Sequence, residues 1–396
     1  MKRLLSFVLI AGLLVAPAAH AAPKKIAVKP LQLLTTVGTP EEVSGVVASG
    51  KSLIVYGSKA AKAYARAVDT TGKELWNLSL DQSVASIATA AVVDSVGDIW
   101  IAGATPLALG LTPPSPAATP INPDNAAAVP TTNVSNLQAV TLWRVTAAGV
   151  LAGTNTLPTS SVVFPTAISV DRNGASIVGI IGTEKGSAGF FVNTDKAGLF
   201  GKLLQIGLSS TTADAVVRHT DGSFTVAGSS SETLVGKKVA GVTDGVLIKI
   251  SKASKITSVV RSSAVKGKRI WNSATSTLLL GGEVVAGGKT ETAITKFTTS
   301  FAPTWTYRFA STGPAVTVGS TYAAFISTGP TPQLNWNPKV ATPLLLTFNA
   351  KGTVVAADSG PIGQKELLGA ILSKELGLLV VTASADTVSI FTLIPR

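Results

Sequence analysis

The residues of this chain best suited to chemistry stand together in HTDGSFTVAGSS, residues 219–230. His219 is one of only two histidines in the sequence, and Asp221 and several serines lie within a few positions of it. Histidine is the usual general base for a serine nucleophile, and an aspartate that orients the imidazole would complete a hydrolytic triad. The first question is therefore whether this stretch is an active site or a turn.

A comparison along the chain favours the turn. The same plan of apolar run, glycine-containing turn and alternating strand recurs in AAVVDSVGDIWIAGAT (90–105) and AISVDRNGASIVGIIG (167–182). Alternation bounded by Asp, Asn and Gly is the signal of a β-hairpin. The counterparts of His219 are Arg172 and Val96, so the position has no fixed chemistry. We predict a hairpin turn at 219–222 and assign no catalytic residue.

Carboxylates offer the other route to an enzyme, because a glycosidase needs two of them about 5–9 Å apart. Most of the aspartates fall in predicted turns, where the side chain satisfies backbone N–H groups. The acids nearer the longer connections are Glu232, Asp244, Glu283, Glu291 and Asp124. Their spacing does not pair them, so a carbohydrate-active hydrolase or lyase stays as the alternative function. His20 lies in the expected secretion signal, so one histidine and no cysteine remain, which give no multi-histidine or thiolate metal site, and we predict neither a metal nor a cofactor.

The elements that must position these residues form a repeat of four short antiparallel strands, about 45–50 residues long, which is the signature of propeller blades. First hairpins begin near Val43, Ala88, Thr166, Ala213, Lys268, Val316 and Glu366. The last unit has three strands, and the segment 26–38 is a strand without a hairpin partner. We predict an all-β, seven-bladed β-propeller spanning 22–396 in one domain, its ring closed by that N-terminal strand. A count of six or eight blades is the alternative, because the repeat pattern is degenerate in the fifth and sixth units.

The blade pattern carries a family resemblance. GDIWIAGAT, followed later by DGVLIKISKASK, resembles the secreted bacterial β-propeller repeats with a G-N-x-Y-V-x-G strand and then a D-x-F-V-x-K-L-x-x-x-G strand. The pattern is similar, more distantly, to quinoprotein-like propellers, whose blades end in G-x-x-x-W, as residues 72–76 do. The resemblance implies a propeller of this WD40-like or quinoprotein-like kind. It implies no particular activity, because such families include binding proteins, scaffolds and enzymes.

The N-terminus has the features of a secretion signal: Lys2 and Arg3, an apolar run to Val15, and small residues before a cleavage site after Ala21. We therefore expect residues 1–21 to be removed and the protein to be secreted, periplasmic or at the cell envelope, with no transmembrane span. The formal charge of +12 favours anionic partners such as envelope polymers. An exported chain without a basic-aromatic motif is not expected to bind nucleic acid, and we expect a monomer.

Loop lengths indicate which face binds. Turns inside the hairpins are short, whereas the connections between the two hairpins of a unit are longer at 106–136, 229–243, 283–291 and 328–342. Alternate connections of a meander lie on one side, and insertions collected on one face usually mark a binding face. Trp336 stands there between Asn335 and Asn337 in a polar loop, and Lys237 and Lys238 form a basic pair. These five residues are the candidate ligand-binding site. Trp336 could instead fold back onto a blade, whereas the strand tryptophans 76, 100, 143 and 305 are expected between blades.

The sequence thus predicts an exported, non-enzymatic binding or scaffold protein that presents its variable loops to a protein or glycan at the cell envelope.

Overall fold

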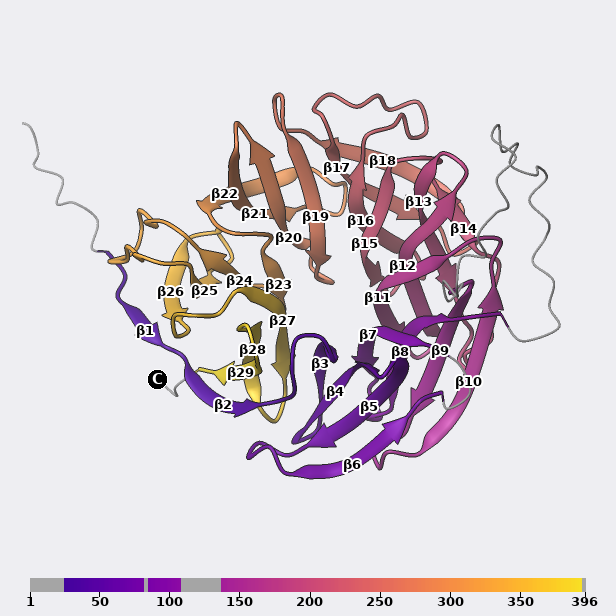
Figure 1. Ribbon diagram of the computed structural model, residues 1–396. Coiled ribbons are helices and arrows are strands. Elements are labelled where there is room, and N and C mark those ends of the chain that lie inside the picture. Colours follow the sequence, from indigo (N-terminus) through magenta and orange to yellow (C-terminus); the bar gives the residue numbers. More distant parts are fainter. Residues whose placement is uncertain (1–24, 82–84, 108–136, 394–396) are drawn as a thin grey trace, which may run out of the picture.

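The structure is a computed structural model that describes residues 25–81, 85–107 and 137–393, and every regular element in these ranges is a β-strand. The strands form seven sheets arranged as blades around a central axis (Figure 1). In each blade the first strand is innermost, and in blades 1 to 5 the fourth is outermost. The fold is therefore a seven-bladed β-propeller, as the repeat predicts.

Blades 1 to 4 follow one another along the chain. They contain, in order, β3 (Val43–Ser49), β4 (Ser52–Lys59), β5 (Lys62–Val68) and β6 (Glu74–Ser79); β7 (Ile87–Val93), β8 (Ile99–Thr105), β9 (Ala139–Val145) and β10 (Leu151–Pro158); β11 (Val163–Asp171), β12 (Gly174–Thr183), β13 (Gly186–Asn193) and β14 (Leu204–Ile206); and β15 (Thr211–Arg218), β16 (Phe224–Ser230), β17 (Asp244–Ile250) and β18 (Ile256–Ser262).

Blades 5 to 7 complete the ring. They contain β19 (Lys268–Ala274), β20 (Leu279–Ala286), β21 (Lys289–Phe297) and β22 (Pro303–Ala310); β23 (Val316–Val318), β24 (Tyr322–Ser327), β25 (Thr342–Phe348) and β26 (Val354–Ser359); and β27 (Glu366–Ser373), β28 (Gly377–Ala383) and β29 (Val388–Thr392). Two N-terminal strands, β1 (Val28–Pro30) and β2 (Gln32–Thr36), join blades 6 and 7.

The predicted N-terminal strand closes the ring, but it does so as two strands. β2 pairs antiparallel with β29 and supplies the missing outer strand of blade 7. β1 pairs parallel with β26 and adds a fifth strand to blade 6. Between them, the N–H of Leu31 donates to the carbonyl of Ser359 at 2.8 Å, and the Leu31 side chain is buried in the cluster between these two blades. The N-terminal segment therefore bridges two blades.

The hydrophobic interior lies between blades. Seven clusters of buried side chains are present among the described residues, and each joins one pair of neighbouring blades around the ring. The predicted role of the tryptophans is confirmed at these contacts. Trp76 of blade 1 donates its indole N–H to the carbonyl of Ala147 in blade 2 at 3.2 Å, and Trp305 of blade 5 stacks on Phe348 of blade 6 at a centroid distance of 5.0 Å.

The recurring glycine of the repeat has a steric cause. In five blades the inner strand carries a β-bulge, and the second strand places a glycine against it. A Cβ on these glycines would lie 1.9–2.2 Å from an inner-strand or adjacent carbonyl oxygen, at Gly57, Gly103, Gly179, Gly228 and Gly282. The repeat that reveals these five blades in the sequence thus marks a bulge that leaves no room for a side chain opposite it, whereas the bulge of blade 7 has Thr382 at that position.

Gly228→Ala is expected to lower the free energy of unfolding by about 1–3 kcal/mol, because the added methyl group must displace the backbone of β15. Gly153→Ala is the matched control, since a Cβ there would meet nothing within 4 Å. Urea unfolding followed by tryptophan fluorescence would measure both variants. Equal stability of Gly228→Ala and Gly153→Ala would contradict the bulge explanation.

Candidate functional site

Residues 219–222 form the predicted hairpin turn, and β16 follows it. The N–H of His219 donates to the carbonyl of Ser223, and the N–H of Gly222 donates to the carbonyl of His219, both at 2.9 Å. The half-buried imidazole of His219 bonds Thr225 Oγ1 through Nε2 at 2.8 Å, while the carboxylate of Asp221 accepts from the N–H and hydroxyl of Ser223. Burial lowers the pKa of His219. The aspartate and the histidine thus bind different partners, and the arrangement is not a Ser-His-Asp triad.

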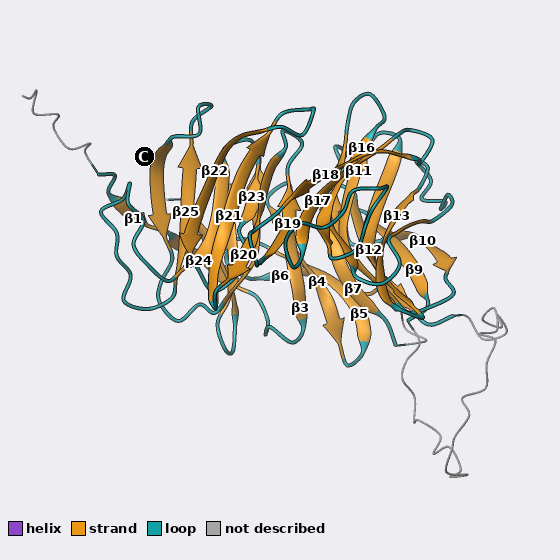
Figure 2. Cartoon of the chain, turned by 90° about the horizontal axis from the view of Figure 1, so that it is seen from above, coloured by secondary structure: helices purple, strands orange, loops and turns teal. Residues whose placement is uncertain are grey.

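The strands run through the thickness of the ring, so their connections emerge on two opposite faces (Figure 2). The turns between first and second strands, including 219–222, and those between third and fourth strands lie on one face, which we call the turn face. The connections between second and third strands lie on the other, together with the links between blades, and we call this the loop face. The long connections predicted for the loop face are present between β16 and β17 and between β24 and β25. In blade 2 the connection falls within 106–138, and its residues 108–136 lie outside the described residues.

The expected long connection at 283–291 is wrong. These residues belong to β20 and β21, which pair directly from Leu279↔Lys296 to Ala286↔Lys289. The two glycines between the strands, Gly287 and Gly288, both have positive φ angles of 57° and 72°. Such a pair makes the two-residue hairpin turn that matches the strand twist, so no longer loop is needed.

The loop between β16 and β17 comprises residues 231–243 and is fixed by one arginine, so we call it the clamped loop. Arg261 donates from Nε to the carbonyl of Lys237 at 3.1 Å and from Nη1 to the carbonyl of Ser230 at 3.2 Å, and its Nη2 bonds the carbonyl of Glu232. Its guanidinium also pairs with the fully buried carboxylate of Asp244 at 3.4 Å. Asp244 in turn accepts the N–H groups of Ala240 and Gly241, both at 2.9 Å.

The other acid of the clamped loop is also engaged. The carboxylate of Glu232 accepts the N–H groups of Leu208, Ser209 and Ser210 at 3.0–3.1 Å and the hydroxyl of Thr211 at 2.7 Å. Burial alone would raise the pKa of Glu232, and these hydrogen bonds hold it below its ordinary value. In the same way, backbone donors and Arg261 outweigh burial and lower the pKa of Asp244. Both carboxylates therefore hold backbone in place.

The remaining acids considered for catalysis are placed as follows. Glu291 is paired with Arg308, and the half-buried Glu283 has its pKa raised by burial. Asp124 lies outside the described residues. In the part of the chain that the structure describes, no group of three or more metal-ligating side chains comes together, and no helix could cross a membrane.

The predicted ligand-binding residues come from two separate loops. Lys237 and Lys238 are exposed on the clamped loop. Asn335 and Asn337 are exposed on the loop between β24 and β25, which is tied to the N-terminal segment by the N–H of Asn335 and the carbonyl of Ile26 at 2.9 Å. Trp336 is half-buried against the core between blades 5 and 6, and its indole N–H is enclosed without a partner. Its part in ligand binding stays a prediction.

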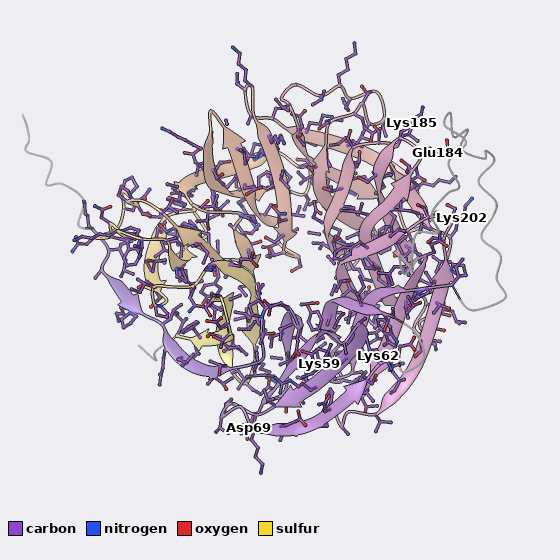
Figure 3. The ribbon with its side chains drawn as sticks, viewed as in Figure 1. Lys59, Lys62, Asp69, Glu184, Lys185 and Lys202 are labelled. Carbon is purple, nitrogen blue, oxygen red and sulfur yellow. The ribbon has the colours of Figure 1, made fainter. Side chains whose placement is uncertain are left out.

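Two further grooves are present among the described residues. One of about 460 Å³ lies on blade 1 around Tyr64 and includes Lys59 and Lys62, which Figure 3 marks at the turn between β4 and β5; Lys59 pairs with Glu42 at 3.3 Å. The other, about 700 Å³, lies on the turn face between blades 2 and 3. There Arg144 lies over the ring of Trp100 and pairs with Asp98 at 2.7 Å. Sequence reasoning missed both grooves, because each is assembled from turns or strands of more than one hairpin.

The comparison with solved structures agrees with the propeller fold. The WD40 domain of coronin from Toxoplasma gondii superposes with a TM-score of 0.51 at 10% sequence identity, covering 94% of this chain and 90% of that domain. At this identity the likeness shows the fold alone. No protein-family model and no curated protein matches the sequence, so the relation to the secreted bacterial repeat proteins stays a prediction.

Proposed function

We propose that this protein is a non-enzymatic binding scaffold, exported to the cell envelope, whose loop face receives a protein partner. The clamped loop is the observation that carries the proposal. Blades 1, 3 and 5 connect their second and third strands with two residues, whereas blade 4 uses thirteen, residues 231–243. Propeller geometry does not require this length, yet a buried ion pair and carbonyl hydrogen bonds fix its shape. A long connection held rigid suits a binding surface, because little conformational freedom remains to be lost on association.

A protein partner is favoured over a glycan by the state of Trp336. A tryptophan that stacks on a sugar must present a free ring, and this indole already packs against the core between blades 5 and 6. The exposed groups around it, Asn335 and Asn337, and the exposed Lys237 and Lys238 suit a polar rim of a protein interface. Export rests on the signal-like residues 1–21, which lie outside the described residues.

The proposal is tested by affinity capture from envelope fractions of the source cell, with the mature chain from residue 22 as bait and cross-linking with mass spectrometry as the readout. We expect a protein that binds reproducibly, and at least tenfold weaker retention by Lys237→Glu/Lys238→Glu. The matched control is Lys252→Glu/Lys255→Glu, which makes the same charge change at exposed positions on the turn face. Equal retention by both double variants, or selective binding to a glycan array without a protein partner, would overturn the proposal.

A further inference from the structure

A small apolar pocket opens beside the clamped loop, between the outer strands of blades 3 and 4. Its volume is about 270 Å³. Its apolar lining comprises Ile206, Leu208, Leu234, Val235, Ile248, Ile256 and Val259. Leu208 and Val235 are 61% and 68% exposed, whereas Ile206, Leu234, Ile248 and Val259 are buried in the core between the two blades. The pocket therefore has an apolar floor continuous with the core and an apolar rim in water.

The rim is built on a strained turn. Leu234 and Lys237 exchange backbone hydrogen bonds of 3.1 and 2.8 Å across Val235 and Gly236, whose φ angles are +47° and +72°. A two-residue turn with both φ angles positive strongly favours Asn-Gly or Gly-Gly. Valine is β-branched, and in the left-handed region such a residue is an outlier that persists only where its surroundings hold it there. Arg261 supplies that restraint through the carbonyls of Glu232 and Lys237.

The charged side chains beside the pocket that have no ion-pair partner among the described residues are the lysines of the clamped loop. The one acid among its lining residues, Glu232, is occupied by four donors from residues 208–211. Lys237 and Lys238 follow the strained turn directly and are exposed, and among the residues that the structure describes no carboxylate pairs with either ammonium group. A partner that fits both features would carry an apolar group for the pocket and negative charge for the rim.

We propose that this pocket anchors a large apolar side chain of a protein partner, and that acidic residues beside that side chain pair with Lys237 and Lys238. This inference rests on the proposed function and names the chemistry of its partner. The volume is below the 300–1,000 Å³ typical of small-molecule sites and suits one side chain, the kind of anchor that dominates protein interfaces. The strained Val235 exposes its two methyl groups to water at the rim of the pocket, where a partner would cover them.

The decisive variant is Val235→Asn, which replaces a strained Val-Gly turn with the favoured Asn-Gly pair. Relief of strain is expected to raise the folded-to-unfolded ratio about fivefold, whereas loss of the apolar lip is expected to weaken partner binding at least fivefold. Val242→Asn is the matched control, because Val242 is 53% exposed on the same loop without a positive φ angle. It should change neither quantity. A role in folding alone would move stability and binding together, so the opposite signs are diagnostic.

The probe is a synthetic twelve-residue peptide with one central leucine flanked by glutamates, compared with its leucine-to-serine and glutamate-to-lysine versions. Isoleucine methyl NMR of the mature chain should show saturable shifts at Ile206, Ile248 and Ile256 with the first peptide, and at least tenfold weaker binding of the other two. Shifts elsewhere, equal binding of the three peptides, or Val235→Asn binding as the wild type does would overturn the inference.

The two proposals fail in different ways. If the Lys237→Glu/Lys238→Glu variant loses an envelope partner that Val235→Asn retains, the binding function stands and the apolar anchor is wrong. If the wild-type chain captures no protein and the acidic peptide produces no shifts, both are wrong.

Discussion

Replacement of Arg261 by methionine is expected to lower the free energy of unfolding by about 3–5 kcal/mol. Methionine keeps much of the length and apolar stem of the side chain but removes the guanidinium. The carboxylate of Asp244, 0% exposed, would then be left with a buried charge and no cationic partner, and three backbone carbonyls, two of them in the clamped loop, would lose a donor. Removing one partner of a buried ion pair is more damaging than replacing both, because desolvation of the remaining charge is no longer compensated.

Urea unfolding measures the loss, and hydrogen exchange over residues 231–243 shows whether the clamped loop opens. Arg172→Met is the matched control, since Arg172 is exposed on the turn face and no ion pair is formed by it among the described residues. The double variant Asp244→Asn/Arg261→Met should be less destabilised than the sum of its single variants, because the charge that the first change removes is the one that the second leaves unpaired. A loss below about 1 kcal/mol with unchanged exchange would contradict the clamp.

Asp214→Asn is expected to raise the free energy of unfolding at pH 7 by about 2–3 kcal/mol. Asp214 is the extra residue of the bulge in β15, on the innermost strand of blade 4, and accepts a hydrogen bond from Thr212 Oγ1 at 2.5 Å. Burial raises its pKa from 3.8 to about 6, against this hydrogen bond. A difference of about two pKa units corresponds to about 3 kcal/mol by which the ionised carboxylate destabilises the fold, whereas an asparagine accepts the same hydrogen bond without a charge.

The direction of the pKa shift determines how the stability difference between Asp214→Asn and the wild type changes with pH. Because the folded pKa lies above the unfolded one, the destabilisation is fully present above about pH 6 and disappears as the pH falls through 6 towards 4. The advantage of Asp214→Asn over the wild type should therefore be largest at pH 7–8 and near zero at pH 4. Thermal unfolding across this range measures it, with Asp386→Asn in the exposed turn between β28 and β29 as the control for net charge. An advantage that does not shrink on acidification would exclude titration of Asp214 as its cause.

The blade count was predictable because its signal is local and repeated. In blades 1 to 5 a glycine of the second strand stands opposite the inner-strand bulge, and many of the short turns contain glycine, aspartate or asparagine, so these five blades carry the same mark in the same place. The outer-strand role of β2 was predictable because blade 7 lacks a strand. The division of the N-terminal segment at Leu31 was not predictable, since parallel pairing of β1 with β26 depends on how blade 6 is positioned in the closed ring.

The candidate site was less accessible to sequence reasoning. Lys237 and Lys238 were found because charged residues in a long connection stand out, but the clamp that holds them was not. Glu232 and Asp244 have the residue types of catalytic acids. Arg261 reaches Asp244 from the neighbouring strand of blade 4, whereas the backbone of residues 208–211 engages Glu232 only when blades 3 and 4 meet. The strained turn was not predictable, because Val-Gly is not a pair that indicates positive φ angles at both positions.

The N-terminal segment that bridges blades 6 and 7 has a consequence for the order of events during synthesis. Leu33 pairs with Phe391, so β2 must wait about 360 residues of synthesis for its partner strand β29. Blades 1 to 5 can form on partial chains, but the ring can close only after translation has passed residue 391. From the synthesis of β29 until the ring closes, β29 has no outer neighbour, and its exposed edge is a template for pairing with another chain. The interval before closure is therefore when this molecule is most exposed to aggregation, and when a chaperone would have most effect.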